Sequence, residues 1–243
     1  MNDIIPRAGS TDIWNAYMVY GASFTPNSDM PICHYLGGEI PKKLISYDKA
    51  KHIFKSRIKS EPNFKSDAYV HFYIDDQKFD GKRNGIWLYP EKAYDILCHF
   101  AGVISPDFST CQDFPDALKR YNFYRMRTFD YWLHRKGLPV IYNVRWGTKE
   151  TWQYCFDGIP NSCMVCIGTV ASGIRKKENR PIFVAGLFEM VKRISPHTIV
   201  VYGSSNLECF KTLANTGIQI ISFPSQTSLA FATLKGGSKD EQT

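Results

Sequence analysis

The chain has 243 residues, of which 44% are hydrophobic, and it carries a formal net charge of +7. This length allows one large α/β domain or two small ones. No apolar run approaches the roughly 20 residues of a transmembrane helix, and the first residues show no signal-peptide pattern. We therefore expect a cytoplasmic protein with no membrane partner. The positive charge favours partners that carry phosphate, nucleic acid among them.

The seven cysteines are an odd number, which predicts free thiols in a chain without a signal peptide. Cys163 and Cys166 have the spacing of a metal or redox pair. They lie within a strand-like run, however, where residues three apart point to opposite faces of the sheet. We therefore expect buried core thiols and no metal site.

Three regions follow one another along the chain. Residues 1–41 are rich in loops and are expected to cover the main domain; 12–21 could form a short helix or an edge strand. Residues 42–226 form a single α/β domain, and 227–243 are predicted to be a disordered tail. The expected strands are 43–47, 68–76, 102–108, 138–144, 163–169, 198–202 and 218–223. The expected helices are 49–59, 90–100, 115–136, 148–156, 180–194 and 207–216.

This alternation predicts about seven mostly parallel strands joined by right-handed helical crossovers. Polar side chains end several successive strands, which suits a ring of loops around one mouth. We therefore favour a barrel-like fold of the TIM type, possibly incomplete, over the alternative of an open doubly wound sheet. Both architectures bind ligands at the carboxyl ends of their strands.

Candidate site residues lie at these strand ends. Asp107 can act as a general base, hold a ribose hydroxyl or pair with a cation, although a turn or cap aspartate is the alternative. Asn143 and Arg145 share one face of their strand, where an arginine can grip phosphate or simply pair with Asp107. Trp146 offers a stacking surface for a base, or else packs in the core.

A second candidate is the loop of Gly203, Ser204 and Ser205, which joins a late strand to a helix. Glycine and hydroxyl residues before a helix can cradle phosphate, although an ordinary serine or asparagine helix cap is the commoner explanation. Asp75 and Asp76 end an earlier strand, and since neighbours point to opposite faces, at most one is expected to reach the mouth.

Two clusters of basic residues could contact nucleic acid or could simply be solvated helix faces. The first comprises Lys42, Lys43, Lys51, Lys55, Arg57 and Lys59, and the second comprises Arg175, Lys176, Lys177 and Arg180.

Arg125 interrupts an apolar stripe on the longest helix, between Tyr121 and Phe129. A buried arginine needs a partner, so we expect it to be bonded to a carboxylate, from Asp107 or Asp157.

Several motifs together resemble an uncharacterised family, one of the domain-of-unknown-function families of bacteria, phages, prophages and plasmids. The resemblance runs from about Asp12 to Ser225. Its motifs are Gly-Val-Ile-Ser-Pro-Asp-Phe-Ser at 102–109, Asn-Val-Arg-Trp-Gly at 143–147, the helix with Arg125 and Arg127 ahead of Trp132, and the stretches 155–159 and 201–203. It implies a single domain from a mobile element, working in the host cytoplasm if a phage encodes it. It supplies no catalytic residues.

Two hypotheses on function remain open. The first is a mobile-element enzyme that acts on a nucleotide or nucleic acid, with Asp107 as the acid or base, Asn143 and Arg145 as the polar grip, and the glycine-serine loop as the phosphate cradle. The second is a non-catalytic phage accessory protein that binds a nucleotide, nucleic acid or host protein to modulate host defence or replication. The cofactor is unknown in both.

Overall fold

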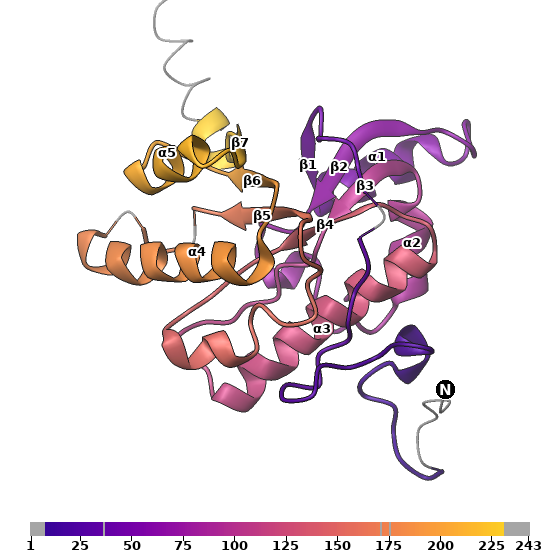
Figure 1. Cartoon of the computed structure of the whole chain (residues 1–243). Helices are drawn as coiled ribbons and strands as arrows, with labels where there is room; N and C mark the ends of the chain where they lie inside the picture. Colours follow the sequence, from indigo (N-terminus) through magenta and orange to yellow (C-terminus); the bar gives the residue numbers. More distant parts are fainter. Residues whose placement is uncertain (1–7, 36, 171, 175, 231–243) are drawn as a thin grey trace, which may run out of the picture.

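The structure is a computed structural model that describes residues 8–35, 37–170, 172–174 and 176–230 (Figure 1). The described residues form one sheet of seven strands, ordered as in the sequence, and every neighbouring pair is parallel. The strands are β1 (Leu44–Ser46), β2 (Ser66–His71), β3 (Phe100–Ile104), β4 (Val140–Asn143), β5 (Met164–Gly168), β6 (Thr198–Tyr202) and β7 (Gln219–Phe223).

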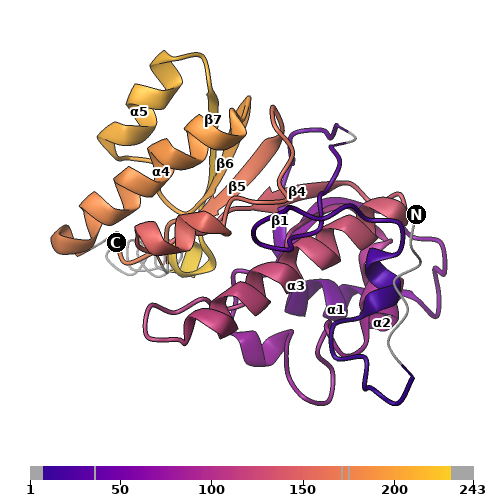
Figure 2. The same ribbon diagram turned by 60° about the horizontal axis from the view of Figure 1, so that its bottom comes forward.

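Helices follow most of the strands and cover the outer face of the sheet, which curls into a half-barrel (Figures 1 and 2). The expected barrel-like α/β fold is thereby confirmed. The α-helices are α1 (Tyr47–Arg57), α2 (Pro90–Leu97), α3 (Asp116–Arg135), α4 (Arg180–Ile194) and α5 (Glu208–Asn215). The 3-10 helices are η1 (Ala16–Val19), η2 (Asp76–Lys78), η3 (Lys149–Gln153) and η4 (Lys177–Asn179).

Three elements are shorter than the sequence pattern predicts, each for a local reason. Strand β2 ends at His71, because the Tyr73 amide turns back to donate to the ring of that histidine. Strand β3 ends just before Ser105 and Pro106, and the proline has no amide hydrogen to continue the ladder. The helix expected over 148–156 is only η3, where the Thr151 hydroxyl bonds to the backbone in competition with helical bonds.

Side-chain alternation divides the core into two apolar layers. The outer layer, between sheet and helices, includes Cys163 and Val165. The inner layer includes Met164 and Cys166, with residues of β2, β3, β4 and β6. The two cysteines therefore lie on opposite faces of the sheet, as the alternation predicted, and both thiols are buried.

Tyrosines fill the inside of the half-barrel. Tyr73, just after β2, stacks on Tyr202 of β6 with ring centroids 4.8 Å apart and an interplanar angle of 11°. A Cβ on Gly168 would come within 2.8 Å of the Tyr73 ring, so glycine is required for this approach. Past the end of β7, the Gln226 amide donates to the Ser46 hydroxyl at 2.7 Å. The two edges of the sheet thus approach each other at the carboxyl ends of the strands.

The described part of the expected cover, residues 8–35 and 37–41, runs along α3 (Figure 1). Hydroxyls of Tyr121, Tyr124 and Tyr131 on that helix donate to carbonyls of the segment. At the other end, residues 226–230 form a helical turn, and 231–243 of the predicted tail lie outside the described residues. None of the helices described here has the length and apolar character to cross a membrane.

Candidate functional site

A cleft of about 1000 Å³ opens at the carboxyl ends of the strands. We call it the mouth cleft. On one side its walls are formed by residues of the loop and η2 after β2 and of the loop before α3. Residues after β4, described residues between β5 and the first turn of α4, and residues after β7 complete them. The expected site residues Asp107, Arg145 and Trp146 line it, together with Tyr202. The sequence therefore located the cleft correctly.

A chain of polar contacts crosses the floor of the mouth cleft. An Arg145 guanidinium nitrogen lies 2.8 Å from Asp107 Oδ1, and Asn143 Nδ2 donates to the same oxygen at 2.7 Å. The Tyr73 hydroxyl donates to Asn143 Oδ1 at 2.9 Å and contacts Cys166 Sγ at 3.2 Å. The ion pair considered from the sequence is formed, and Asn143 belongs to the same network.

Burial and the charge of Asp107 together determine which groups of this network are ionised. The Arg145 side chain is 25% exposed and that of Asp107 only 12%. The neighbouring Asp107 charge raises the pKa of Arg145 above its ordinary value, so the guanidinium stays charged. Desolvation raises the pKa of the Tyr73 phenol well above its usual range and that of the Cys166 thiol to about 12. Neither group is therefore a nucleophile at neutral pH.

Trp146 is both part of the core and part of the cleft wall. Its indole nitrogen donates to the Phe183 carbonyl at 3.2 Å, and its ring lies 5.1 Å from the Phe183 ring. A Cβ on Gly186 of α4 would come within 2.1 Å of the indole. Helix α4 therefore fixes the indole, which is half-buried and leaves part of its surface in the cleft.

The loop of Gly203, Ser204 and Ser205 does not line the mouth cleft. The Gly203 amide donates to the Phe223 carbonyl, and the Ser204 hydroxyl accepts from the Asn206 amide. Helix α5 begins later, with an acidic residue in its first turn. Phosphate binding at this loop stays a prediction, separate from the cleft.

Asp75 and Asp76 both line the cleft, contrary to the expectation that only one would reach it. Because β2 ends at His71, strict alternation no longer applies at these positions. Both carboxylate oxygens of Asp76 accept hydrogen bonds from Ser109, which joins η2 to the loop before α3. Within the described residues, no group of three or more His, Cys, Asp or Glu side chains is placed to hold a metal ion.

Arg125 is buried and ion-paired, as expected, but its partner is neither Asp107 nor Asp157. Its guanidinium lies 2.7 Å from Asp80 and also donates to Asn122 Oδ1. Asp80 lies in a turn region without periodicity, so the sequence did not indicate it. The guanidinium also lies 3.9 Å from the centroid of the Phe108 ring, directly beside Asp107 in the chain. Arg125 therefore supports the loop that carries the candidate carboxylate.

Three residues of this region were missed from the sequence as parts of the site. Tyr73 lies two residues past the end of β2, and the alternation of Tyr69 and His71 would have placed it on the inner face. Arg127 and Asp130 form a fully buried ion pair at 2.8 Å, and Arg127 also donates to the Asn143 carbonyl. This ion pair holds the backbone of Asn143 in place through the bond to its carbonyl. No sequence pattern distinguished Arg127 and Asp130 from other polar residues of the helix.

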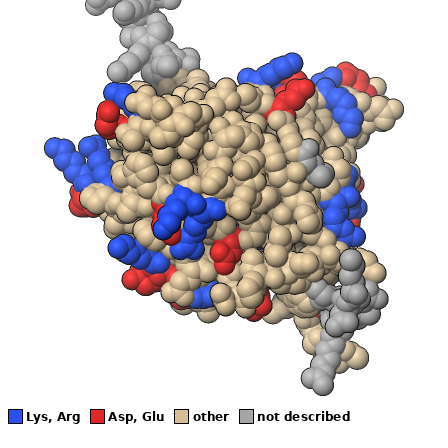
Figure 3. Space-filling model, viewed as in Figure 1, with Lys and Arg blue, Asp and Glu red and all other residues tan. Residues whose placement is uncertain are grey.

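Charge within the mouth cleft is nearly balanced. Three carboxylates, Asp75, Asp76 and Asp107, face two cations, Lys78 and Arg145, which gives a net charge of −1. On the face seen in Figure 3, Lys and Arg form several separate groups interspersed with acidic residues. The cleft itself therefore has limited capacity for anionic groups.

Residues 29–224 match the family described as "Domain of unknown function (DUF4417)". The chain belongs to this family. Two phage proteins are also similar to this DUF4417 chain. The "Gene 1 protein" of Mycobacterium phage D29 is 30% identical over 165 residues, covering 68% of this chain and 56% of the phage protein. The "Gene 1 protein" of Mycobacterium phage L5 is 33% identical over 140 residues, covering 57% of this chain and 58% of the phage protein.

The DUF4417 chain thus aligns with little more than half the length of either phage protein. No solved structure matches it significantly. The resemblance to an uncharacterised, phage-associated family is confirmed, while the individual sequence motifs assigned to that family stay a prediction.

Proposed function

We propose that this protein binds one nucleotide in the mouth cleft and acts on it there. The observation that carries the proposal is the state of Arg145. Among the described residues Asp107 is its one polar partner, yet a guanidinium has five N–H donors. The remaining donors are partly exposed at the cleft and held in place by the ion pair. A phosphate or carboxylate is the group that such a fork binds best.

The walls of the cleft support a nucleotide over a simpler anion. Half-buried Trp146 brings aromatic surface to the same cavity as Arg145, and a base stacks favourably on such a ring. Phe183 and Tyr202 also line the cavity but are each only 4% exposed. The volume of about 1000 Å³ lies at the upper end of the range for small-molecule sites. With a net charge of −1, the cleft suits one phosphate better than a polyphosphate.

Asp107 is the best candidate for chemistry. Both of its bonds, to Arg145 and Asn143, use Oδ1. No described residue donates a hydrogen bond to Oδ2, so it is the atom that can accept a proton from a ligand or a water. Tyr73 and Cys166 stay protonated, and the Tyr73 hydroxyl orients Asn143 by donating to its Oδ1.

A second function is favoured by the same ion pair. Asp107 is already paired with Arg145, and burial keeps the Tyr73 phenol and the Cys166 thiol protonated. These features suit a binding site that holds a ligand without reacting with it, which we call a clamp. In that case the protein is an accessory binding protein of the phage type, which modulates host defence or replication through a nucleotide, nucleic acid or host protein.

Titration with a panel of mononucleotides, followed by tryptophan fluorescence and calorimetry, tests the proposal. Arg145→Met should weaken binding by about 10- to 150-fold, the range expected when one charge-assisted hydrogen bond of roughly 1.5–3 kcal/mol is lost. Lys211→Met removes an exposed cation on α5, outside the cleft lining, and should change nothing. Binding that is undetectable at millimolar nucleotide, or equal for wild type and Arg145→Met, would refute the proposal.

Chromatography of the incubated nucleotides separates the two functions. Turnover that Asp107→Asn abolishes, while binding persists, identifies an enzyme. Binding without turnover of any nucleotide identifies the clamp. Mass spectrometry of small molecules that copurify with the protein would name the ligand directly.

A further inference from the structure

Two groups of exposed cations flank the mouth cleft. On the first side, Lys49, Lys55 and Lys59 are exposed, and none has an acidic partner among the described residues. Lys55 lies about 120° around the α1 axis from Lys49 and about 9 Å further along it, and Lys59 follows the end of the helix. On the second side, Lys176 and Lys177 are exposed just before α4.

The first group, on α1, adjoins the cleft through η2. The ammonium group of Lys51 donates to the Lys78 carbonyl at 2.6 Å, and Lys78 lines the cleft. The Lys78 ammonium group also lies 3.9 Å from the Asp48 carboxylate in the first turn of α1. Lys49, in the first turn of α1, is therefore the member of this group nearest the rim of the cleft, and Lys55 and Lys59 lie further along the helix.

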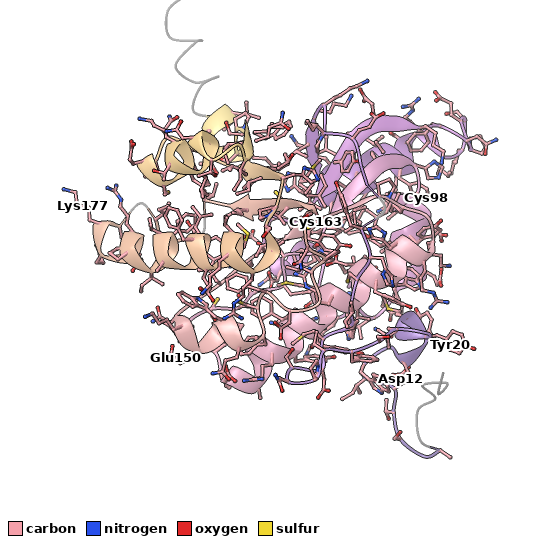
Figure 4. All side chains as sticks on the ribbon, viewed as in Figure 1. Asp12, Tyr20, Cys98, Glu150, Cys163 and Lys177 are labelled. Carbon is pink, nitrogen blue, oxygen red and sulfur yellow. The ribbon has the colours of Figure 1, made fainter. Side chains whose placement is uncertain are left out.

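The second group adjoins the cleft through η4. Gly173 and Asn179 line the cleft, and the Asn179 amide donates to the Lys176 carbonyl. Figure 4 shows Lys177 at the start of α4, projecting away from the body of the protein. Helices α1 and α4 lie on opposite sides of the molecule in Figures 1 and 2. Lys49 and the second group are therefore on opposite sides of the cleft, and Lys55 and Lys59 continue along α1 away from it.

We infer that the ligand of the mouth cleft is one nucleotide of a longer single-stranded nucleic acid, whose flanking phosphates contact the two basic groups. This inference rests on the proposed function. Inside the cleft, Arg145 can neutralise about one phosphate, and the three carboxylates there disfavour more. The uncompensated lysines lie outside, where the neighbouring phosphates of a strand would be. A base that enters the cleft must be unpaired, which selects single strands over duplexes.

Fluorescence anisotropy with a labelled 12-mer single strand, measured from 50 to 200 mM salt, tests the inference. Each phosphate contact contributes about 0.7 to the slope of log K against log salt for a single strand. The triple variant Lys49→Gln, Lys55→Gln, Lys59→Gln should therefore reduce the slope by about 2. The double variant Lys176→Gln, Lys177→Gln should reduce it by about 1.4. Mononucleotide affinity should be unchanged in both, because neither group lines the cleft.

The control removes two positive charges elsewhere, with Lys192→Gln at the end of α4 and Lys211→Gln on α5, and should leave the slope unchanged. The inference is wrong if the strand binds no more tightly than a mononucleotide, if a duplex binds as tightly as the strand, or if the control lowers the slope as much as the rim variants. Those results leave mononucleotide binding in place. A different result would overturn the proposed function: the single strand binds equally well to wild type and to Arg145→Met, and mononucleotides do not bind at all.

Discussion

Replacing Arg125 by methionine should lower the free energy of unfolding by about 2–4 kcal/mol, because it leaves a half-buried carboxylate without its cation. Arg125 is 9% exposed, and its guanidinium lies 2.7 Å from Asp80 and donates to Asn122. Each bond to a charged group contributes about 1.5–3 kcal/mol, and the contact with the Phe108 ring adds about 0.5–2 kcal/mol. Methionine fits the apolar surroundings and avoids the desolvation of a cation, which offsets part of the loss.

Urea denaturation followed by circular dichroism measures this change, and Arg120→Met on the same helix is the matched control. The Arg120 side chain is 38% exposed and its ion pair with Asp116 is at the surface, so its loss should cost less than about 1 kcal/mol. Burial already raises the pKa of Asp80, and Arg125 opposes that shift. Without Arg125 the folded-state pKa rises further, so protonation restores stability at low pH. The deficit should therefore grow as the pH rises through the wild-type folded-state pKa of Asp80, which lies above the ordinary 3.8 of the carboxyl.

The double variant Arg125→Met, Asp80→Asn should recover part of the loss, because the stranded charge is gone. The reasoning fails if Arg125→Met is no more harmful than Arg120→Met. It also fails if the two substitutions add without recovery, since contacting partners should couple.

Three further predictions concern other parts of the fold. Burial lowers the pKa of His71 and of His134 to about 4, so their contribution to stability is complete above pH 6.5 and is lost as the pH falls towards 4. Urea midpoints that do not change between pH 6.5 and 4 would contradict this. Gly186→Ala should cost about 1–3 kcal/mol and shift the emission of Trp146, because the added methyl overlaps the indole; unchanged emission would show that the indole is not fixed by α4. Ellman's reagent should react fastest with Cys111, the exposed thiol, and Cys111→Ser should remove the fast phase. A fast phase that persists would mean that half-buried Cys98 or a buried thiol is as accessible as Cys111.

Regular elements were predictable because burial produces periodicity. The expected helix over 180–194 coincides with α4, and the expected strand over 198–202 coincides with β6. Strands β4 to β6 are buried on both faces, which produces the apolar runs visible in the sequence. Parallel order and the position of the cleft follow from that alternation.

Contacts made by irregular segments were not predictable. Asp80 pairs with Arg125 from a turn region where no period indicates direction, so the sequence suggested the wrong carboxylates. Alternation from β2 gives the face of Tyr73, but not its contacts with Asn143 and Tyr202, which lie far along the chain. The buried pair of Arg127 and Asp130 lies in the middle of a helix, where its charges resembled an ordinary polar face.

The stacking of Tyr73 on Tyr202, and the bond from Gln226 to Ser46, have a consequence for how the protein is made. These contacts join residues 129 and 180 positions apart in the chain. Such non-local contacts carry a large loop-closure entropy and form late in folding. Since synthesis proceeds from the amino terminus, the earlier strands emerge from the ribosome well before Tyr202 and Gln226 exist. The mouth cleft is therefore completed only by the last part of the chain, after most of the sheet has been synthesised.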